Sequence, residues 1–169
     1  MVSSIQDKNI LPMRVLVIAN RYSISKVSVG SIINSYISIL RDELLGGREI
    51  RVLGLFSIVP NVIVDNRIST TACIAQKVSD DTGISYTTCF HVIKSYLEAL
   101  KDELSQGISV DVRSIVTLHP IFEEGTLTCI HASVSSSIRR DLAIQNGAVT
   151  SVRVHTSKLL KSVLCTKEA

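Results

Sequence analysis

The sequence has no tryptophan, and its 169 residues include only three prolines, two methionines and 4% aromatic residues. A hydrophobic core must therefore be built mostly from isoleucine, valine and leucine, since 46% of the residues are hydrophobic. No uninterrupted apolar run approaches the roughly 20 residues that a membrane span requires. The N-terminal segment from Met1 to Met13 lacks the charged and then apolar layout of a signal peptide. These absences predict a cytoplasmic protein without a membrane partner.

Patterns that carry chemistry are also missing. The cysteines stand singly and the histidines have neither i,i+4 nor metal-ligand spacing, so zinc is not expected. No glycine-rich phosphate loop, nucleophile elbow or H-E-x-x-H motif occurs. We expect buried cysteines, surface or partly packed histidines, and neither an enzyme, a cofactor, a metal nor a small-molecule substrate. The residues concerned are Cys73, Cys89, Cys129, Cys165, His91, His119, His131 and His155.

The net charge is only +3, and its distribution is uneven. Residues 1–60 contain seven lysines and arginines against four acidic residues, whereas residues 61–169 contain eleven of each. Proteins that hold DNA through its phosphates usually show a basic face or stripe. The mild excess at one end leaves DNA binding open without favouring it.

One pattern occurs twice in the chain, 60 positions apart and without a gap. Ile24 to Pro60 corresponds to Ile84 to Pro120. The matching pairs are Ser35-Tyr36 with Ser95-Tyr96, Leu40-Arg41-Asp42-Glu43-Leu44 with Leu100-Lys101-Asp102-Glu103-Leu104, Gly47 with Gly107, and Val52 with Val112. A match of this quality predicts a tandem duplication of one small module.

Each copy is expected to begin with a short helix followed by a longer one. Residues 14–20 alone fit a strand or a helix, and their counterpart at 72–79 has helical spacing, so a short helix is favoured. Ser25 and Ser85 are candidate N-caps of the longer helices, because a serine hydroxyl can accept from the free amides of the first turn.

The longer helices are expected to end at Gly46-Gly47 and at Gly107. The repeated Asp42-Glu43 and Asp102-Glu103 are expected at the solvated ends of these helices. Each helix has one broad apolar face, on which the matched tyrosines are interpreted as packing residues and not as functional groups. The predicted module-pairing interface consists of Ile33, Tyr36, Leu40, Ile93, Tyr96 and Leu100.

A β-hairpin is predicted after each long helix, at residues 50–59 and 110–118, because these segments are rich in β-branched residues. Each hairpin is expected to end at its proline, Pro60 or Pro120, since proline cannot donate a hydrogen bond inside a ladder.

The two copies then diverge. Arg67 to Thr70 corresponds to Arg153 to Thr156, but Arg67 follows Pro60 after a short link, whereas a long insertion separates Arg153 from Pro120. Inside the insertion, residues 126–132 and 148–154 are predicted strands, separated by the polar segment 133–147. We expect an extended two-stranded arm with a flexible tip, Glu123-Glu124 at its root, and a short closing helix at 157–164.

This order of elements resembles that of the HU/IHF family of bacterial histone-like proteins. Residues 47–56 look like the segment leading into the family's glycine–phenylalanine hairpin, and Arg153 to Leu164 is similar to the strand and closing helix after the family's arm. The resemblance covers about residues 14–164. It implies an α+β fold of two HU/IHF-like modules in one chain, each with a short helix, long helix, β-hairpin and short closing helix.

The resemblance also implies a division of the chain. Family members are dimers whose long helices pack together while two β-arms grip the DNA minor groove. Two copies in one chain imply a single-chain pseudo-dimer, or two modules that each pair with another subunit. A single module would leave much of its apolar helix face wet, and a second copy can cover it. The implied parts are an N-terminal tail at 1–13, an armless module at 14–71, a module at 72–165 with its β-arm at 121–153, and a C-terminal tail at 166–169.

Two hypotheses for function follow. The first is an assembly protein that uses the fold for protein–protein contact or self-assembly, for example a phage virion or connector component in the host cytoplasm and the virion. The second is an architectural DNA-binding protein. The neutral larger half and an arm suited to adding strands to a neighbour's sheet favour the first, since the arm lacks the family's proline-centred basic tip. Phosphate contacts under the second hypothesis would come from Arg139, Arg140, Arg153, Lys158 and Lys161.

Overall fold

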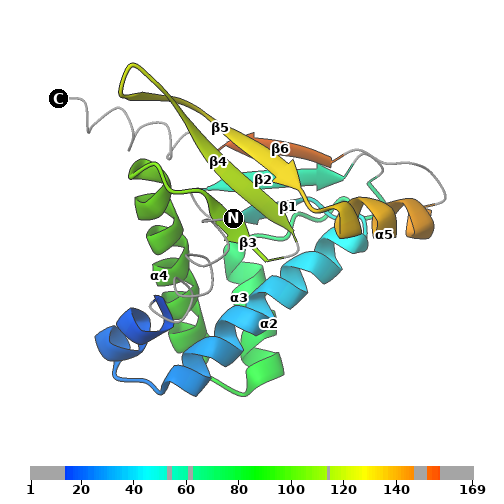
Figure 1. Cartoon of the computed structure of the whole chain (residues 1–169). Helices are drawn as coiled ribbons and strands as arrows, with labels where there is room; N and C mark the ends of the chain where they lie inside the picture. Colours follow the sequence, from blue (N-terminus) through cyan, green and yellow to red (C-terminus); the bar gives the residue numbers. More distant parts are fainter. Residues whose placement is uncertain (1–13, 53–54, 61–62, 114, 147–151, 157–169) are drawn as a thin grey trace.

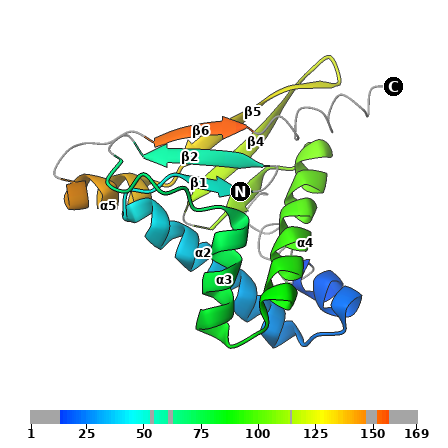
Figure 2. The same cartoon turned by 180° about the vertical axis from the view of Figure 1, so that it is seen from behind.

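The computed structural model describes residues 14–52, 55–60, 63–113, 115–146 and 152–156. In these residues the chain forms five helices and two small antiparallel sheets, which confirms the predicted α+β class. The sheets form one layer and the long helices a second layer beneath it (Figure 1). The view from behind shows α3 in front of α2 and beside α4 (Figure 2).

The helices follow the predicted order. An N-terminal helix covers residues 14–22, which confirms the helical interpretation of this segment. The others are α2 (Lys26–Leu45), α3 (Thr71–Thr82), α4 (Tyr86–Ser105) and α5 (Ser136–Asn146). Both bounds of α4 are the repeat equivalents of the bounds of α2, so the duplication seen in the sequence is preserved in the fold.

Local chemistry explains the bounds of α2 and α4. Ser25 caps α2 by accepting from the amide of Ser28, and Ser85 caps α4 by accepting from the amide of Thr88. Each such cap contributes about 1 kcal/mol. Both helices end before a glycine with positive φ, Gly47 or Gly107 in the two copies, and this conformation favours glycine.

The two sheets also repeat each other. One has the order β1–β2–β6, with β1 (Ile50–Val52), β2 (Phe56–Pro60) and β6 (Val152–Thr156). The other has the order β3–β4–β5, with β3 (Val110–Val112), β4 (Val116–Glu123) and β5 (Thr126–Val134). Ile50 lies opposite Ile58 in the first sheet and Val110 opposite Leu118 in the second, so equivalent positions of the repeat pair in the same register. Both predicted hairpins are confirmed.

The predicted pairing of the arm is wrong. β5 pairs with β4 and not with the strand at 152–156, which crosses to the other sheet and pairs with β2. The segment between them, expected to be a flexible tip, contains α5. β5 lies beside β4 in one sheet. In the other sheet, β6 from the far end of the chain occupies the equivalent position beside β2. β6, which belongs to the second predicted module, thus completes the sheet of the first.

Two further expectations about this region are corrected. Pro60 ends β2 as predicted, but Pro120 lies inside β4, opposite Ile130, and β4 continues to Glu123. Glu123 and Glu124 lie at the tip of the β4–β5 hairpin and not at the root of an arm. Proline is tolerated there, although it lacks an N–H, because β3 pairs only as far as Leu118, so beyond it β4 has a partner strand on one side alone.

Arg67 to Thr70 and Arg153 to Thr156 are not structural equivalents. Ser69 forms an isolated parallel bridge with Ile50, along β1, whereas Arg153 lies in β6 beside β2. The sequence match between these segments therefore does not correspond to matched positions in the two sheets.

A single hydrophobic core joins the two halves of the chain, which are the predicted modules at 14–71 and 72–165. It combines the apolar faces of α2, α3 and α4 with both sheets and with Ile138 and Leu142 of α5. The six residues predicted to pair the modules are each exposed by 1% or less, and α2 contacts α4 directly. All six therefore belong to the shared core. The tails at 1–13 and 166–169 and the closing helix at 157–164 lie outside the described residues.

Candidate interaction surfaces

The β4–β5 hairpin extends beyond the helical layer (Figure 1). From Val116 to Val134 it contains no lysine or arginine. Its turn is formed by Glu124 and Gly125, which have φ of 52° and 78°, as a two-residue hairpin turn of type I′ requires. A glutamate in this left-handed conformation costs about 1 kcal/mol relative to glycine. The hairpin thus presents carboxylates at its tip despite a local backbone penalty.

Apolar side chains lie exposed next to this acidic tip. Ile121 is 40% exposed and Phe122 is 41% exposed, while Ile108 near the end of α4 is 38% exposed. The Phe122 ring lies over Gly107, because a Cβ added to that glycine would come within 3.3 Å of the ring. Exposed apolar side chains beside charged ones are the usual composition of a protein contact surface.

Two histidines face each other in the middle of the hairpin. His119 of β4 and His131 of β5 are direct cross-strand partners, with ring centroids 6.5 Å apart. His119 Nδ1 is 2.9 Å from the hydroxyl of Ser109. Among the described residues, no three histidine, cysteine, aspartate or glutamate side chains gather as a metal site.

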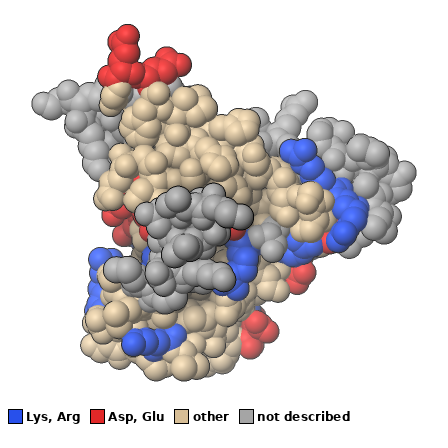
Figure 3. Space-filling view, viewed as in Figure 1, with Lys and Arg blue, Asp and Glu red and all other residues tan. Residues whose placement is uncertain are grey.

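Helix α5 is anchored to the core on one face and has two exposed arginines. Ile138 and Leu142 are fully buried, one turn apart, and fix one face of the helix to the core. Asp141 accepts a hydrogen bond from Arg41 of α2 over 2.5 Å. Arg139 and Arg140 are exposed, and Figure 3 shows basic side chains gathered around α5 and acidic ones at the hairpin tip.

The predicted DNA contacts are only partly described by the structure. Arg139 and Arg140 are neighbours on α5, and Arg140 also pairs weakly with Asp141 at 3.5 Å. Arg153 lies in β6 opposite Val59. The other two predicted contacts, Lys158 and Lys161, lie outside the described residues. Among these five residues, the structure thus describes one pair of neighbouring cations, Arg139 and Arg140 on α5.

Of the repeated acidic residues, Asp42 and Asp102 are exposed as expected, whereas Glu43 is buried and Glu103 is partly buried. Glu103 of α4 accepts a hydrogen bond over 2.8 Å from Nε of Arg14, which lies on the N-terminal helix. Glu43 of α2 contacts the ammonium group of Lys77, which lies on α3. Each glutamate is therefore held by a cation from the short helix of the opposite half, and the two contacts are reciprocal.

Glu43 is only 8% exposed and has two further partners. Arg48 and Ser69 each donate to its Oε2 over 2.6 Å. Burial alone would raise the pKa of Glu43, but the hydrogen bonds from Lys77, Ser69 and Arg48 outweigh it and lower the pKa to about 2. The carboxylate is thus a charged tie between α2, α3 and the loop after β2.

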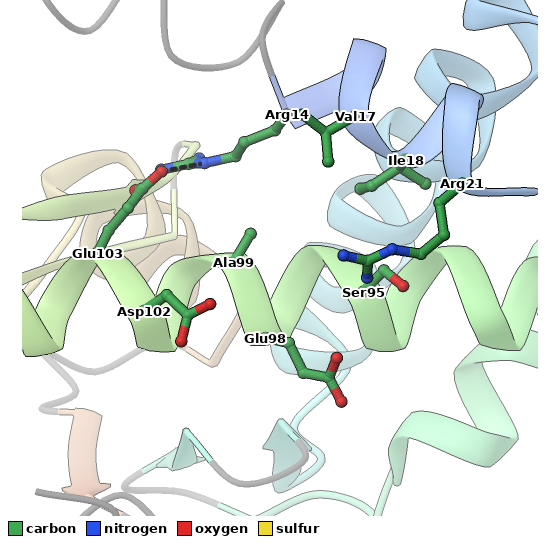
Figure 4. A pocket seen from close by; sticks show the side chains of 9 residues that line it. All are labelled: Arg14, Val17, Ile18, Arg21, Ser95, Glu98, Ala99, Asp102 and Glu103. Carbon is green, nitrogen blue, oxygen red and sulfur yellow. Dashed lines mark hydrogen bonds and ion pairs between the residues drawn. The ribbon is translucent and has the colours of Figure 1, made fainter.

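A pocket of about 350 Å³ lies between the N-terminal helix and α4 (Figure 4). Val17, Ile18 and Ala99 supply its apolar lining. The Ser95 hydroxyl at its side is 2.8 Å from the Tyr22 hydroxyl, so it belongs to the contact between the two helices. No histidine is among the described residues that line this pocket. The remaining lining residues are Arg14, Arg21, Glu98, Asp102 and Glu103.

A second, more open groove of about 640 Å³ lies between α2 and α3. Its lining is rich in serine, and Ser35 donates to Asp81 over 2.7 Å across it. Ser35 and Ser95 occupy the same position of the repeat, so both serines join a long helix to the short helix of the other half. The grooves are boundaries between halves, and the polar contacts across them support packing.

The interpretation of the cysteines as buried is wrong for two of them. Cys89 is buried, whereas Cys73 and Cys129 are exposed, and all three are free thiols. Cys165 lies outside the described residues. None of the helices in the described part of the chain is long and apolar enough to span a bilayer.

Several interacting residues were missed from the sequence. No motif surrounds Arg14 or Lys77 in the sequence. Only the recurrence of Glu43 and Glu103 in the repeat indicated that the two glutamates share a role. Helix α5 could have been found from the i,i+4 spacing of Ile138 and Leu142 within a polar segment. No family model, curated protein or solved structure matches this chain.

Proposed function

We propose that this chain is a non-enzymatic assembly protein that uses a doubled HU/IHF-like fold for protein–protein contact, as in a phage virion or connector. The two modules pair within one chain, and the projecting β4–β5 hairpin supplies the contact surface. Two sets of observations support this proposal: the repeat, and the charged and exposed apolar residues of the hairpin.

The repeat supports a single-chain pseudo-dimer. The two long helices, the two hairpins and the two glutamates recur at equivalent positions of the repeat and make equivalent contacts. The cations that hold these glutamates come from the opposite half, as is usual when two like subunits face each other around a twofold axis. A pseudo-dimer of this kind buries the apolar helix faces without a second subunit.

The residues of the β4–β5 hairpin favour a protein over DNA as its partner. In the family that the sequence resembles, paired arms grip DNA with basic, proline-centred tips. Here the β4–β5 hairpin has no lysine or arginine and carries Glu123 and Glu124 at its tip. Carboxylates repel phosphates, whereas exposed Ile121 and Phe122 favour an apolar partner surface. Protein contact is therefore the better supported use of this arm.

DNA titration at two salt concentrations tests the proposal. An assembly protein should bind duplex DNA weakly at low salt, with little further change on replacing Arg139 and Arg140 by alanine. Affinity that falls steeply with salt and is lost in R139A/R140A would overturn the proposal, because counterion release sets the slope. E123A/E124A is the matched control, since the same number of charges is removed at the opposite end.

Architectural DNA binding remains the second candidate because of one observation. Arg139 and Arg140 are both exposed on a helix that is fixed to the core. If they hold phosphates, E123A/E124A should strengthen DNA binding by removing repulsion, while R139A/R140A weakens it.

A further inference from the structure

The acidic tip of the β4–β5 hairpin and the basic face of α5 lie at opposite ends of the sheet layer (Figure 1). We define the acidic tip as Glu123 and Glu124, and the basic face as Arg139 and Arg140. Both glutamates and both arginines are exposed. In the described part of the chain, neither glutamate has an ion-pair partner.

The tip keeps a glutamate where the backbone disfavours it. Glu124 has φ of 52° in a turn position at which glycine, asparagine and aspartate are usual. Backbone strain of this kind occurs often at positions that bind a partner. The exposed Glu124 carboxylate forms no ion pair with the described part of the molecule that would explain its selection. A contact outside the molecule accounts for it better.

The basic face lies on an anchored helix, and its charges are only weakly neutralised within the molecule. Ile138 and Leu142 anchor α5, and the carboxylate of Asp141 is directed to Arg41 of α2 over 2.5 Å. The same carboxylate is 3.5 Å from Arg140, so it neutralises that guanidinium only weakly. Two cations on a rigid helix match the two carboxylates of the acidic tip in charge and in number.

We propose that the acidic tip of one copy docks on the basic face of a second copy, which deepens the assembly function proposed above and rests on it. The surfaces differ and lie at opposite ends, so the contact is heterologous and propagates head to tail into a ring or a filament. Exposed Ile121 and Phe122, next to the tip, add apolar area to the contact. A hairpin end is smaller than a standard interface, so each contact is weak and assembly requires high protein concentration and low salt.

Charge exchange between the two surfaces tests this proposal. One variant carries E123K/E124K and a second carries R139E/R140E, and circular dichroism checks that each is folded. Sedimentation velocity at low salt and rising concentration compares the wild type, each variant alone and their equimolar mixture. Because each variant joins two like-charged surfaces, it should remain monomeric alone. The mixture joins opposite charges where the two variants meet and should restore species larger than either variant forms alone.

A wild type that stays monomeric throughout, or variants that assemble alone as well as the wild type does, would overturn the head-to-tail contact. Either result leaves the assembly function standing with a different protein as partner, whereas only salt-dependent DNA binding overturns that function. If R139E/R140E does not fold, R139Q/R140Q replaces it, paired with E123Q/E124Q. Both neutral variants should then lose assembly, and retention of assembly by either contradicts the proposal.

Discussion

Glu43 and Glu103 occupy the same position of the two long helices, and each is bound by a cation from the short helix of the opposite half. Lys77 of α3 reaches Glu43 of α2, and Arg14 of the N-terminal helix reaches Glu103 of α4. The two halves are therefore tied together twice by contacts of the same kind, although the cations differ.

Removing either cation should destabilise the whole molecule and not one half of it. Lys77→Ala should lower the free energy of unfolding by about 1 kcal/mol, because Lys77 is partly exposed and Arg48 still holds Glu43. Arg14→Ala should cost more, about 2 kcal/mol, because Arg14 is 10% exposed and makes two hydrogen bonds to Glu103. Urea unfolding followed by circular dichroism measures both. Two separate transitions in either variant would contradict the shared core.

Stability should fall with acid in a window set by Glu43. Its pKa is about 2 in the folded protein against an ordinary value of 4.5, so its contribution is complete above pH 4.5 and is lost as the pH falls toward 2. The loss is at most about 3 kcal/mol, and less after solvent screening. Arg67 also lowers the pKa of Asp65, so the wild-type curve alone does not isolate Glu43. Glu43→Gln should be less stable at neutral pH and show a flatter dependence between these values; an unchanged slope counts against the assignment.

Two equivalent leucines should contribute similarly to stability. Leu40 and Leu100 are both fully buried at the same position of the repeat, within one core. Leu40→Ala and Leu100→Ala should each cost about 2–5 kcal/mol by leaving a cavity. Thermal unfolding followed at several wavelengths should remain a single transition in both. A variant that loses only part of its helical signal would indicate that the halves unfold independently.

Two equivalent glycines should respond differently to alanine. Gly47 and Gly107 have φ of 79° and 85°, so alanine costs about 1 kcal/mol at either position from backbone strain alone. At Gly47 the new Cβ would lie 2.6 Å from the Val64 Cβ and 2.9 Å from the Val64 backbone nitrogen, which donates to the Gly47 carbonyl. At Gly107 it would lie 3.3 Å from the outer atoms of the Phe122 ring, which can move. Gly47→Ala should therefore be the more destabilising by chemical denaturation. Equal losses would show that the contact with Val64 can relax.

The sequence alone determined the repeat and the elements that depend on neighbouring residues. The caps at Ser25 and Ser85, the helix ends before Gly47 and Gly107, and the two tight hairpins all follow from contacts between residues close together in the chain. The buried faces of α2 and α4 followed from helical periodicity. These features are local, so the residues that make them carry a readable pattern.

Only the tertiary structure decided which strands pair and which charges are buried. Whether β5 joins β4 or the strand at 152–156 depends on contacts across the whole molecule, and both pairings suit the same alternating residues. Glu43 has the local sequence of a solvated helix end and becomes buried only because Lys77, Arg48 and Ser69 converge on it from other elements. The free energy of such contacts arises from residues brought together by folding, and a chain position by itself does not reveal its distant partner.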